Sequence, residues 1–174
     1  MRKKALLAGL LIILVAASCV FAAGTSVWKI DTSEDLPQGM QARTNFCWTI
    51  DGHLVLFSKD SSLKIQFYLP PGDYKNYKLI VTDRASSQSL IDPMTIESRL
   101  YPDGPDTDGA RTIINIDVNG KEAVFDKGVW WVFDTAHNYN IGRFLKEGIN
   151  TVTFTLDPKS IIRYEIEEIE LTKG

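Results

Sequence analysis

Short runs in which apolar and polar residues alternate fill most of this sequence, and clusters of Gly, Pro, Asn and Asp separate them. In 63–69, for example, the apolar residues Leu63, Ile65, Phe67 and Leu69 occupy every second position. A period of two is typical of a β-strand with one buried face. Many such strands divided by turn residues predict a sandwich or a barrel, and not a parallel sheet joined by helices. We therefore expect an all-β, antiparallel fold.

The alternation also predicts which side chains face the core. The segments 114–118 and 152–156 repeat the period of two. The segment 129–133 is apolar on both faces, which indicates a strand in the middle of a sheet. The residues expected between two sheets are Leu63, Ile65, Phe67, Ile114, Ile116, Trp131, Phe133, Val152, Phe154 and Leu156.

Two dipeptides predict tight turns between paired strands. Asn119-Gly120 and Asp51-Gly52 each lie between two apolar runs, and both are typical of two-residue hairpin turns. One or two short helical turns are expected as well. One would lie at 93–100, after an Asp-Pro start, and the other at 140–146, before a glycine.

The C-terminal run 162–171 allows two interpretations. Ile162, Ile166 and Ile169 have helical spacing, but the apolar residues of 162–166 also alternate as in a strand. Because the preceding sequence is β throughout, we favour a strand with a bulge at Glu167-Glu168, which returns the following apolar residues to the buried face.

The first 22 residues have the layout of an export signal. Three basic residues at 2–4 precede an apolar run at 5–15, which is shorter than the roughly 20 residues needed to span a membrane. Cleavage after Ala22 fits ordinary secretion, and we favour it. The alternative is cleavage of 1–18 before a lipidated Cys19, as in bacterial lipoproteins, although Ala16 stands where such sites usually have Leu. Either interpretation predicts a secreted, periplasmic or cell-surface protein that meets the membrane only through its signal peptide or lipid anchor.

Residues 23–174 contain no repeat or linker, so we expect a single domain there. Its formal charge is −6, against −3 for the whole chain, since the first 22 residues include three basic and no acidic ones. Nucleic acid is therefore not an expected partner, because its binding depends on clustered Lys and Arg. With the cut after Ala22, Cys47 is the one remaining cysteine, and we expect a buried, unpaired thiol.

The C-terminal part of the chain resembles galactose-binding-like β-jelly rolls, which include carbohydrate-binding modules and accessory domains of glycosidases. The resemblance rests on the hairpin Ile116-Asp117-Val118-Asn119-Gly120, and on the turn Leu145-Lys146-Glu147-Gly148-Ile149-Asn150 before the alternating strand 151–156. It implies a two-sheet antiparallel β-sandwich of the jelly-roll type. Members of the family often hold a structural calcium ion.

The segment 130–140 contains the best candidate for a binding site. Sugars present C–H faces to flat rings, and hydroxyl groups to fixed donors and acceptors. If Trp131 faces the core, Trp130 points the other way, either toward a ligand or under a neighbouring loop. The candidate ligand-binding residues are Trp130, His137, Asn138 and Tyr139.

Metal binding and catalysis have weaker support. Asp103, Asp106 and Asp108 are the candidate calcium ligands, but their spacing does not match an EF-hand, and a solvated turn is the favoured interpretation. No other cofactor is expected. The glutamates of 165–170 lie on one strand, whereas the two carboxylates of a glycosidase lie on opposite sides of the scissile bond. The two histidines, His53 and His137, have no catalytic motif around them.

We therefore expect an exported, non-catalytic domain that binds carbohydrate through an aromatic-lined groove. The alternative is a cell-envelope structural or assembly protein that uses the sandwich for protein–protein contact and keeps the aromatic residues in its core. A small jelly-roll glycoside hydrolase is the third option. The expected partner is accordingly a glycan or an envelope protein.

Overall fold

The alternating segments form β-strands throughout the part of the chain that the computed structural model describes, namely residues 24–45, 47–50, 52–57, 60–89, 112–129, 133–160 and 162–174. One 3₁₀ helix, η2 (Gly142–Phe144), interrupts them. The strands are β1 (Thr25–Asp31), β2 (Gln41–Asn45), β3 (Cys47–Ile50), β4 (His53–Leu56), β5 (Ser62–Leu69), β6 (Tyr77–Ser89), β7 (Thr112–Val118), β8 (Lys121–Val129), β9 (Thr135–Asn140), β10 (Gly148–Leu156) and β11 (Ile162–Lys173).

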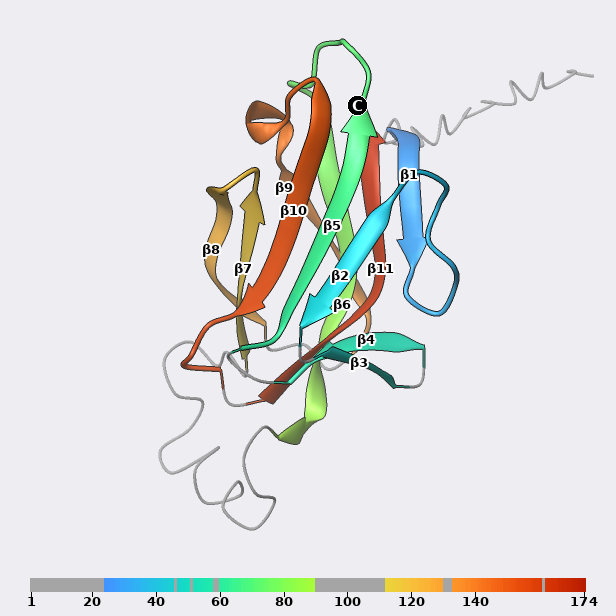
Figure 1. Ribbon diagram of the computed structural model, residues 1–174. Coiled ribbons are helices and arrows are strands. Elements are labelled where there is room, and N and C mark those ends of the chain that lie inside the picture. Colours follow the sequence, from blue (N-terminus) through green and yellow to red (C-terminus); the bar gives the residue numbers. More distant parts are fainter. Residues whose placement is uncertain are drawn as a thin grey trace, which may run out of the picture.

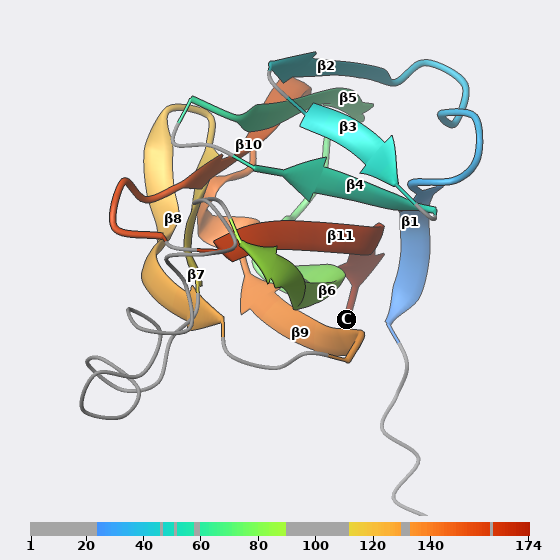
Figure 2. The ribbon, with the colours of Figure 1, turned by 90° about the horizontal axis from the view of Figure 1, so that it is seen from below.

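These strands form two antiparallel sheets that lie face to face (Figures 1 and 2). In sheet A the order is β3-β4-β11-β6-β9, and β1 pairs with the C-terminal half of β11. In sheet B the order is β2-β5-β10-β7-β8. The described residues therefore confirm the predicted antiparallel β-sandwich. None of them forms a helix long and apolar enough to cross a membrane. The expected export signal, with Cys19, lies outside the described residues, as does the helical turn expected at 93–100.

Period-two alternation predicted the core well where a strand was continuous. Eight of the ten residues expected between the sheets are buried there: Leu63, Ile65, Phe67, Ile114, Ile116, Val152, Phe154 and Leu156. Trp131 lies outside the described residues. For Phe133 the prediction was wrong, because this side chain is 80% exposed. It lies between the end of β8 and the start of β9, where strand alternation no longer fixes the direction of a side chain.

Both predicted hairpins are confirmed. Asn119 and Gly120 have φ of 56° and 77°, the left-handed values that a type I′ turn requires of both central residues, and they join β7 to β8. Ile50 pairs with His53, so the second hairpin joins β3 to β4 as expected. The short turn predicted at 140–146 is η2.

The strand interpretation of the C-terminal run is also confirmed. The pairing of β11 with β6 shifts register between Ile166 and Glu168, where the bulge was predicted. The extra residue changes the phase of the alternation, so that Tyr164 and Ile166 before it and Ile169 and Leu171 after it are all fully buried.

Two asparagine side chains connect the β7–β8 hairpin to the turn that precedes β10. Asn119 Nδ2 donates to Asn150 Oδ1 over 2.8 Å, and Asn119 Oδ1 accepts from the Thr151 N–H over 2.9 Å. Asn150 Oδ1 also accepts from the Lys146 N–H at 3.0 Å, and its Nδ2 donates to the carbonyl oxygens of Lys146 and Gly148 at 2.7 and 3.0 Å. The sequence motifs that carry the jelly-roll resemblance are therefore in direct contact, and we call this pair the asparagine clamp.

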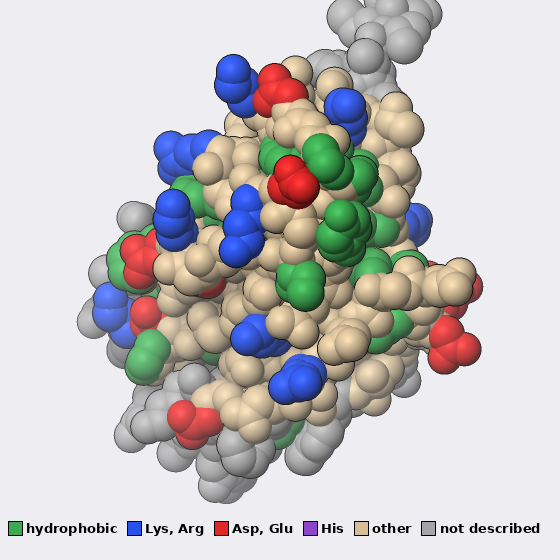
Figure 3. All heavy atoms as spheres, turned by 45° about the horizontal axis from the view of Figure 1, so that its top comes forward, with side chains coloured by type: hydrophobic (Ala, Val, Ile, Leu, Met, Phe, Trp, Pro, Cys, Tyr) green, Lys and Arg blue, Asp and Glu red, His purple; other side chains and the backbone are tan. Residues whose placement is uncertain are grey.

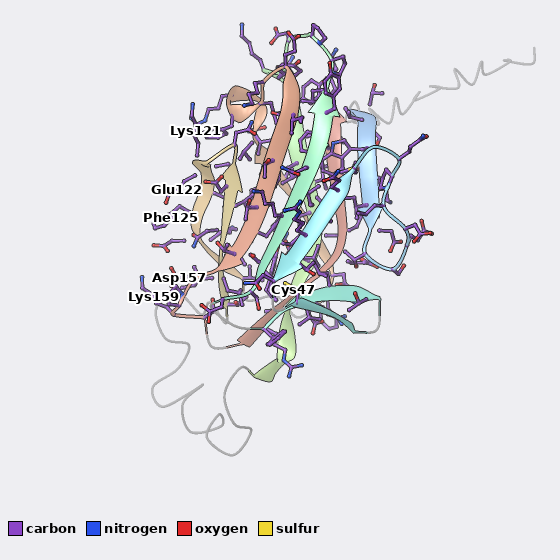
Figure 4. All side chains as sticks on the ribbon, viewed as in Figure 1. Cys47, Lys121, Glu122, Phe125, Asp157 and Lys159 are labelled. Carbon is purple, nitrogen blue, oxygen red and sulfur yellow. The ribbon has the colours of Figure 1, made fainter. Side chains whose placement is uncertain are left out.

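Cys47 opens β3 and lies close to the start of β5 (Figure 4). Its thiol is free, as predicted, but only half-buried. The sulfur lies 3.2 Å from the carbonyl oxygens of Asn45 and Ser62, either of which can accept its hydrogen. Burial raises the pKa of the thiol.

We expect Cys47 to react slowly with a thiol reagent at pH 7, because the reactive thiolate is disfavoured and the sulfur is partly covered. The measurement compares labelling rates in buffer and in denaturant. Equal rates in the two conditions would contradict the protected position.

Replacing Asn150 by Ala should lower the free energy of unfolding by about 2–3 kcal/mol, because part-buried backbone groups of Lys146 and Gly148 would lose the partner that this buried side chain provides. Asn140→Ala is the matched control, since Asn140 is exposed and its loss should cost less than about 0.5 kcal/mol. Urea unfolding measures both. Similar midpoints for the two variants would show that the asparagine clamp does not stabilise the fold.

Candidate functional site

Strand β9, at the edge of sheet A, carries three of the four predicted ligand-binding residues. The side chains of His137 and Tyr139 point into the sandwich, because they pair with the buried residues Val81 and Leu79 of β6. Asn138, between them, is exposed on the outer face of the sheet.

The structure thus brings His137 and Tyr139 together and places Asn138 on the opposite face. Trp130 lies outside the described residues. A site built from all four residues therefore stays a prediction.

The inward face of this part of sheet A surrounds a buried carboxylate, Asp83. Asp83 Oδ2 accepts a 2.8 Å hydrogen bond from the Tyr164 hydroxyl, on the neighbouring strand β11. His137 Nδ1 lies 3.7 Å from Asp83 Oδ1 and 3.0 Å from the carbonyl oxygen of Thr135. Because the Asp83 side chain has no exposed surface, a ligand cannot touch it, and this cluster is part of the core.

Burial sets the protonation states in this cluster. The pKa of Tyr164 is raised well above its usual value, first by burial and then by the Asp83 charge. The same two causes raise the pKa of Tyr139, and burial lowers the pKa of His137. At neutral pH the tyrosines are therefore uncharged, and His137 is mostly neutral.

A second polar cluster lies on the outer face of sheet A. Arg84 Nε donates to Glu165 Oε2 over 2.6 Å, and Arg84 Nη1 lies 3.4 Å from Asp134 Oδ2. Asp134 Oδ1 is 3.0 Å from His53 Nε2. Both carboxylates therefore have a cationic partner, and neither has the environment of a free general acid or base. The histidines His53 and His137 each have a hydrogen-bonding partner.

The outer face of sheet B is open, and the sequence analysis did not identify it as a binding surface. Residues paired across neighbouring strands point to the same side, so the side chains of β2, β5, β10 and β7 form rows. Neighbouring strands are about 4.8 Å apart, and successive outward residues along a strand are about 7 Å apart. The rows are Tyr68 and Ile149; then Gln41, Gln66 and Thr151; then Arg43, Lys64, Thr153 and Asp117. We call this surface the B face.

Tyr68 supplies an exposed aromatic ring on the B face. Its side chain is 62% exposed, and its cross-strand neighbour is Ile149, a pairing of an aromatic with a β-branched residue that favours an ordered ring. Figure 3 shows hydrophobic side chains gathered on this side of the molecule, with both basic and acidic side chains near them.

Two shallow hollows adjoin on the B face, and Ile149 lines both. The smaller, of about 150 Å³, is lined by Gly39, Gln41, Gln66, Phe67, Tyr68 and Ile149. The larger, of about 500 Å³, is lined by Lys64, Asp117, Asn119, Gly120, Lys146, Ile149, Thr151 and Thr153. A flat ring and two amide side chains thus line the smaller hollow, and hydroxyl and charged groups line the larger one beside it.

A signal for this surface was present in the sequence. Tyr68 occupies a polar-phase position of the alternating segment 63–69, where an aromatic side chain points away from the core. Thr151, Thr153 and Thr155 occupy the outward phase of β10 in the same way. An aromatic residue at such a position is a stronger indication of a ligand surface than an aromatic run whose strand boundaries are unknown.

The candidate calcium ligands Asp103, Asp106 and Asp108 lie outside the described residues. Among the residues that are described, no group of three or more His, Cys, Asp or Glu side chains is arranged to hold a metal ion.

No protein-family model matches the sequence, and no curated protein is similar to it in sequence. Solved structures do match the fold. The CBM36-1 domain of a multidomain xylanase from the hindgut metagenome of Trinervitermes trinervoides aligns with a TM-score of 0.52 and 8% identity, over 84% of this chain and 97% of that domain.

Two further similar structures are a cellulose-binding domain and a carbohydrate-binding module. The second N-terminal cellulose-binding domain of Cellulomonas fimi β-1,4-glucanase C has a TM-score of 0.47 and 13% identity, over 87% of this chain and 96% of that domain. The family 35 carbohydrate-binding module from Clostridium thermocellum has a TM-score of 0.46 and 15% identity, over 84% and 99%. The likeness to the CBM36-1 domain confirms the predicted β-jelly-roll fold.

Tyr164→Phe should lower the free energy of unfolding by about 1.5–3 kcal/mol, because it removes a hydrogen bond to a buried charged group, Asp83. Tyr68→Phe is the control, since that side chain is exposed and should tolerate the change within about 0.5 kcal/mol. Denaturant unfolding at pH 7 tests both, and equal stabilities would mean that the buried carboxylate does not need its tyrosine donor.

Proposed function

We propose that this chain is an exported, non-catalytic domain that binds carbohydrate on the B face. The observation that carries the proposal is the exposed ring of Tyr68, set in a depression bordered by hydrogen-bonding side chains. Aromatic side chains of a sandwich are usually packed in its core. The Tyr68 ring is exposed instead, so burial does not stabilise it.

The chemistry of the depression suits a glycan. A sugar ring can lie with its C–H face on Tyr68, while its hydroxyl groups reach the amides of Gln41 and Gln66 and the hydroxyl of Thr151. These side chains come from three neighbouring strands, so the sheet holds them in fixed positions and little ordering is required on binding.

The fold is consistent with this class of ligand, but a fold alone does not select one. The CBM36-1 domain of a multidomain xylanase has a similar fold. The proposal therefore depends on the B face itself. Of the earlier candidates, Asn138 is exposed on the outer face of sheet A and is available to a ligand there, while Trp130 lies outside the described residues.

One observation favours protein–protein contact as a second candidate function. Strand β8 forms an edge of sheet B, and Phe125 on this strand is 59% exposed (Figure 4). An edge strand with an exposed aromatic side chain can pair with another chain. The glycan proposal involves Tyr68 and the protein-contact alternative involves Phe125, so the two can be separated by substitution.

Tyr68→Ala should weaken glycan binding about tenfold, equivalent to about 1.4 kcal/mol, and leave the thermal midpoint nearly unchanged because the ring is exposed. A glycan array identifies the ligands of the wild type, and titration calorimetry on the best one gives the affinities. Phe125→Ala is the matched control, since it removes an aromatic ring of similar exposure from a different strand.

Three results would contradict the proposal. These are the absence of any bound glycan on the array, an equal loss of binding in Tyr68→Ala and Phe125→Ala, and unfolding of the Tyr68→Ala variant. If Phe125→Ala instead abolishes self-association or pull-down of an envelope protein, the protein-contact alternative is supported.

A further inference from the structure

We propose that the glycan bound on the B face is anionic, carrying carboxylate or sulfate groups. This inference rests on the proposed function and specifies the class of its ligand. It is argued from the placement of positive charge on a protein that carries a net negative charge.

Two cations lie directly opposite each other on the B face. Arg43 of β2 is the cross-strand partner of Lys64 of β5, and both side chains are exposed on the outer side of the sheet. Like charges in this position destabilise a sheet. Neither residue makes an ion pair with any part of the chain that the structure describes. The pair therefore places two like charges side by side, and the carboxylate in their row, Asp117, lies beyond Thr153.

Two cations on the outer face of sheet A form ion pairs with carboxylates. On its outer face Lys29 pairs with Glu168, and Arg84 pairs with both Glu165 and Asp134. Arg43 and Lys64, like Lys78 on the outer face of sheet A, make no ion pair with the described residues, although the chain has more acidic than basic residues. An anion supplied by a ligand would complete the B face in the way that glutamates complete sheet A.

A third cation borders the larger hollow. Lys146 lines the larger hollow together with Lys64, and its backbone is fixed at both its N–H and its carbonyl oxygen by Asn150. The hollow has one carboxylate, Asp117, whose Oδ1 already accepts a 2.7 Å hydrogen bond from the Gly120 N–H. The charge on the floor and rim of the hollow is therefore positive overall.

The row of Tyr68 and the row of Arg43 offer a ligand different kinds of contact. Tyr68 offers a stacking surface for a sugar ring, and the cations lie two outward positions further along the sheet, about 14 Å away. The Arg43 guanidinium can bind a carboxylate or sulfate in bidentate fashion, whereas Lys64 and Lys146 act as point charges. A polymer with acidic groups on successive sugars can reach both rows.

The test uses two matched pairs of polymers that differ only or mainly in charge. These are polygalacturonate with its methyl ester, and carboxymethyl cellulose with hydroxyethyl cellulose. Affinities are measured by calorimetry at 0.1 M and 0.5 M NaCl for the wild type, for the double variant Arg43→Gln with Lys64→Gln, and for Tyr68→Ala. Lys78→Gln, which removes an exposed cation from the outer face of sheet A, is the control.

The wild type should prefer an acidic polymer over its neutral partner, and 0.5 M NaCl should reduce this preference. The double variant should lose about fivefold in affinity for the acidic polymer, the scale of an exposed ion pair, while Lys78→Gln does not. Its thermal midpoint should stay the same or rise, because the opposed charges are gone. If Arg43 and Lys64 had only a structural role, the double variant would be less stable. A variant that loses affinity but keeps or gains stability therefore indicates a role in binding.

Other outcomes overturn the inference. Equal binding of both members of each pair, with Tyr68→Ala weakening both, means that the B face binds neutral glycan, and the proposed function stands alone. Binding to none of the polymers overturns the inference, and if the array also contains no Tyr68-dependent ligand, the proposed function fails with it. Polyphosphate serves as a further probe. If it binds as tightly as the acidic polymers and Tyr68→Ala does not weaken its binding, the B face binds polyanions in general. The inference of an acidic glycan is then wrong.

Discussion

The hydrogen bonds of Asn150 determine the register of the strand on which the sandwich is centred. Asn150 is fully buried near the start of β10, and β10 pairs with β5 on one side and β7 on the other. A shift of one residue in β10 would turn its threonines into the core and its apolar residues outward. By holding this asparagine to Asn119 and to the backbone of the preceding turn, the asparagine clamp also places Ile149, Thr151 and Thr153 on the B face. The candidate binding surface therefore depends on a buried amide that no ligand touches.

Most of the fold follows from local sequence because strand alternation, turn dipeptides and the bulge in β11 are all local features. The strands β5, β7, β10 and β11 each bury the residues that a period of two selects. The failure at Phe133 has a physical reason as well. An apolar run predicts burial only while the chain remains in a strand, and β8 ends at Val129. Strand ends depend on pairing with distant residues, which periodicity does not contain.

The candidate site was less predictable, because it depends on which strands are neighbours. Tyr68, Gln41 and Thr151 are far apart in the chain and meet only through the order β2-β5-β10. Strand β9 presents the opposite difficulty. Its sequence, 135–140, is polar, yet its residues His137 and Tyr139 point inward and are partly buried because they pair with Val81 and Leu79 of β6. Sequence patterns identify residues able to bind a sugar, whereas tertiary pairing decides which of them are accessible.

Strand β11 comes last among the described strands, yet it lies between β4 and β6 and is also the strand with which β1 pairs. Thr25 pairs with Lys173, so this part of sheet A joins the first and the last of the described strands. Contacts between residues so distant in sequence form slowly, because a long loop must close before any of them is made. A nascent chain that has not yet reached residue 162 lacks the strand that unites β1, β4 and β6. The pairing in sheet A therefore cannot be completed before β11 has been synthesised, whereas every strand of sheet B precedes β11 in the chain.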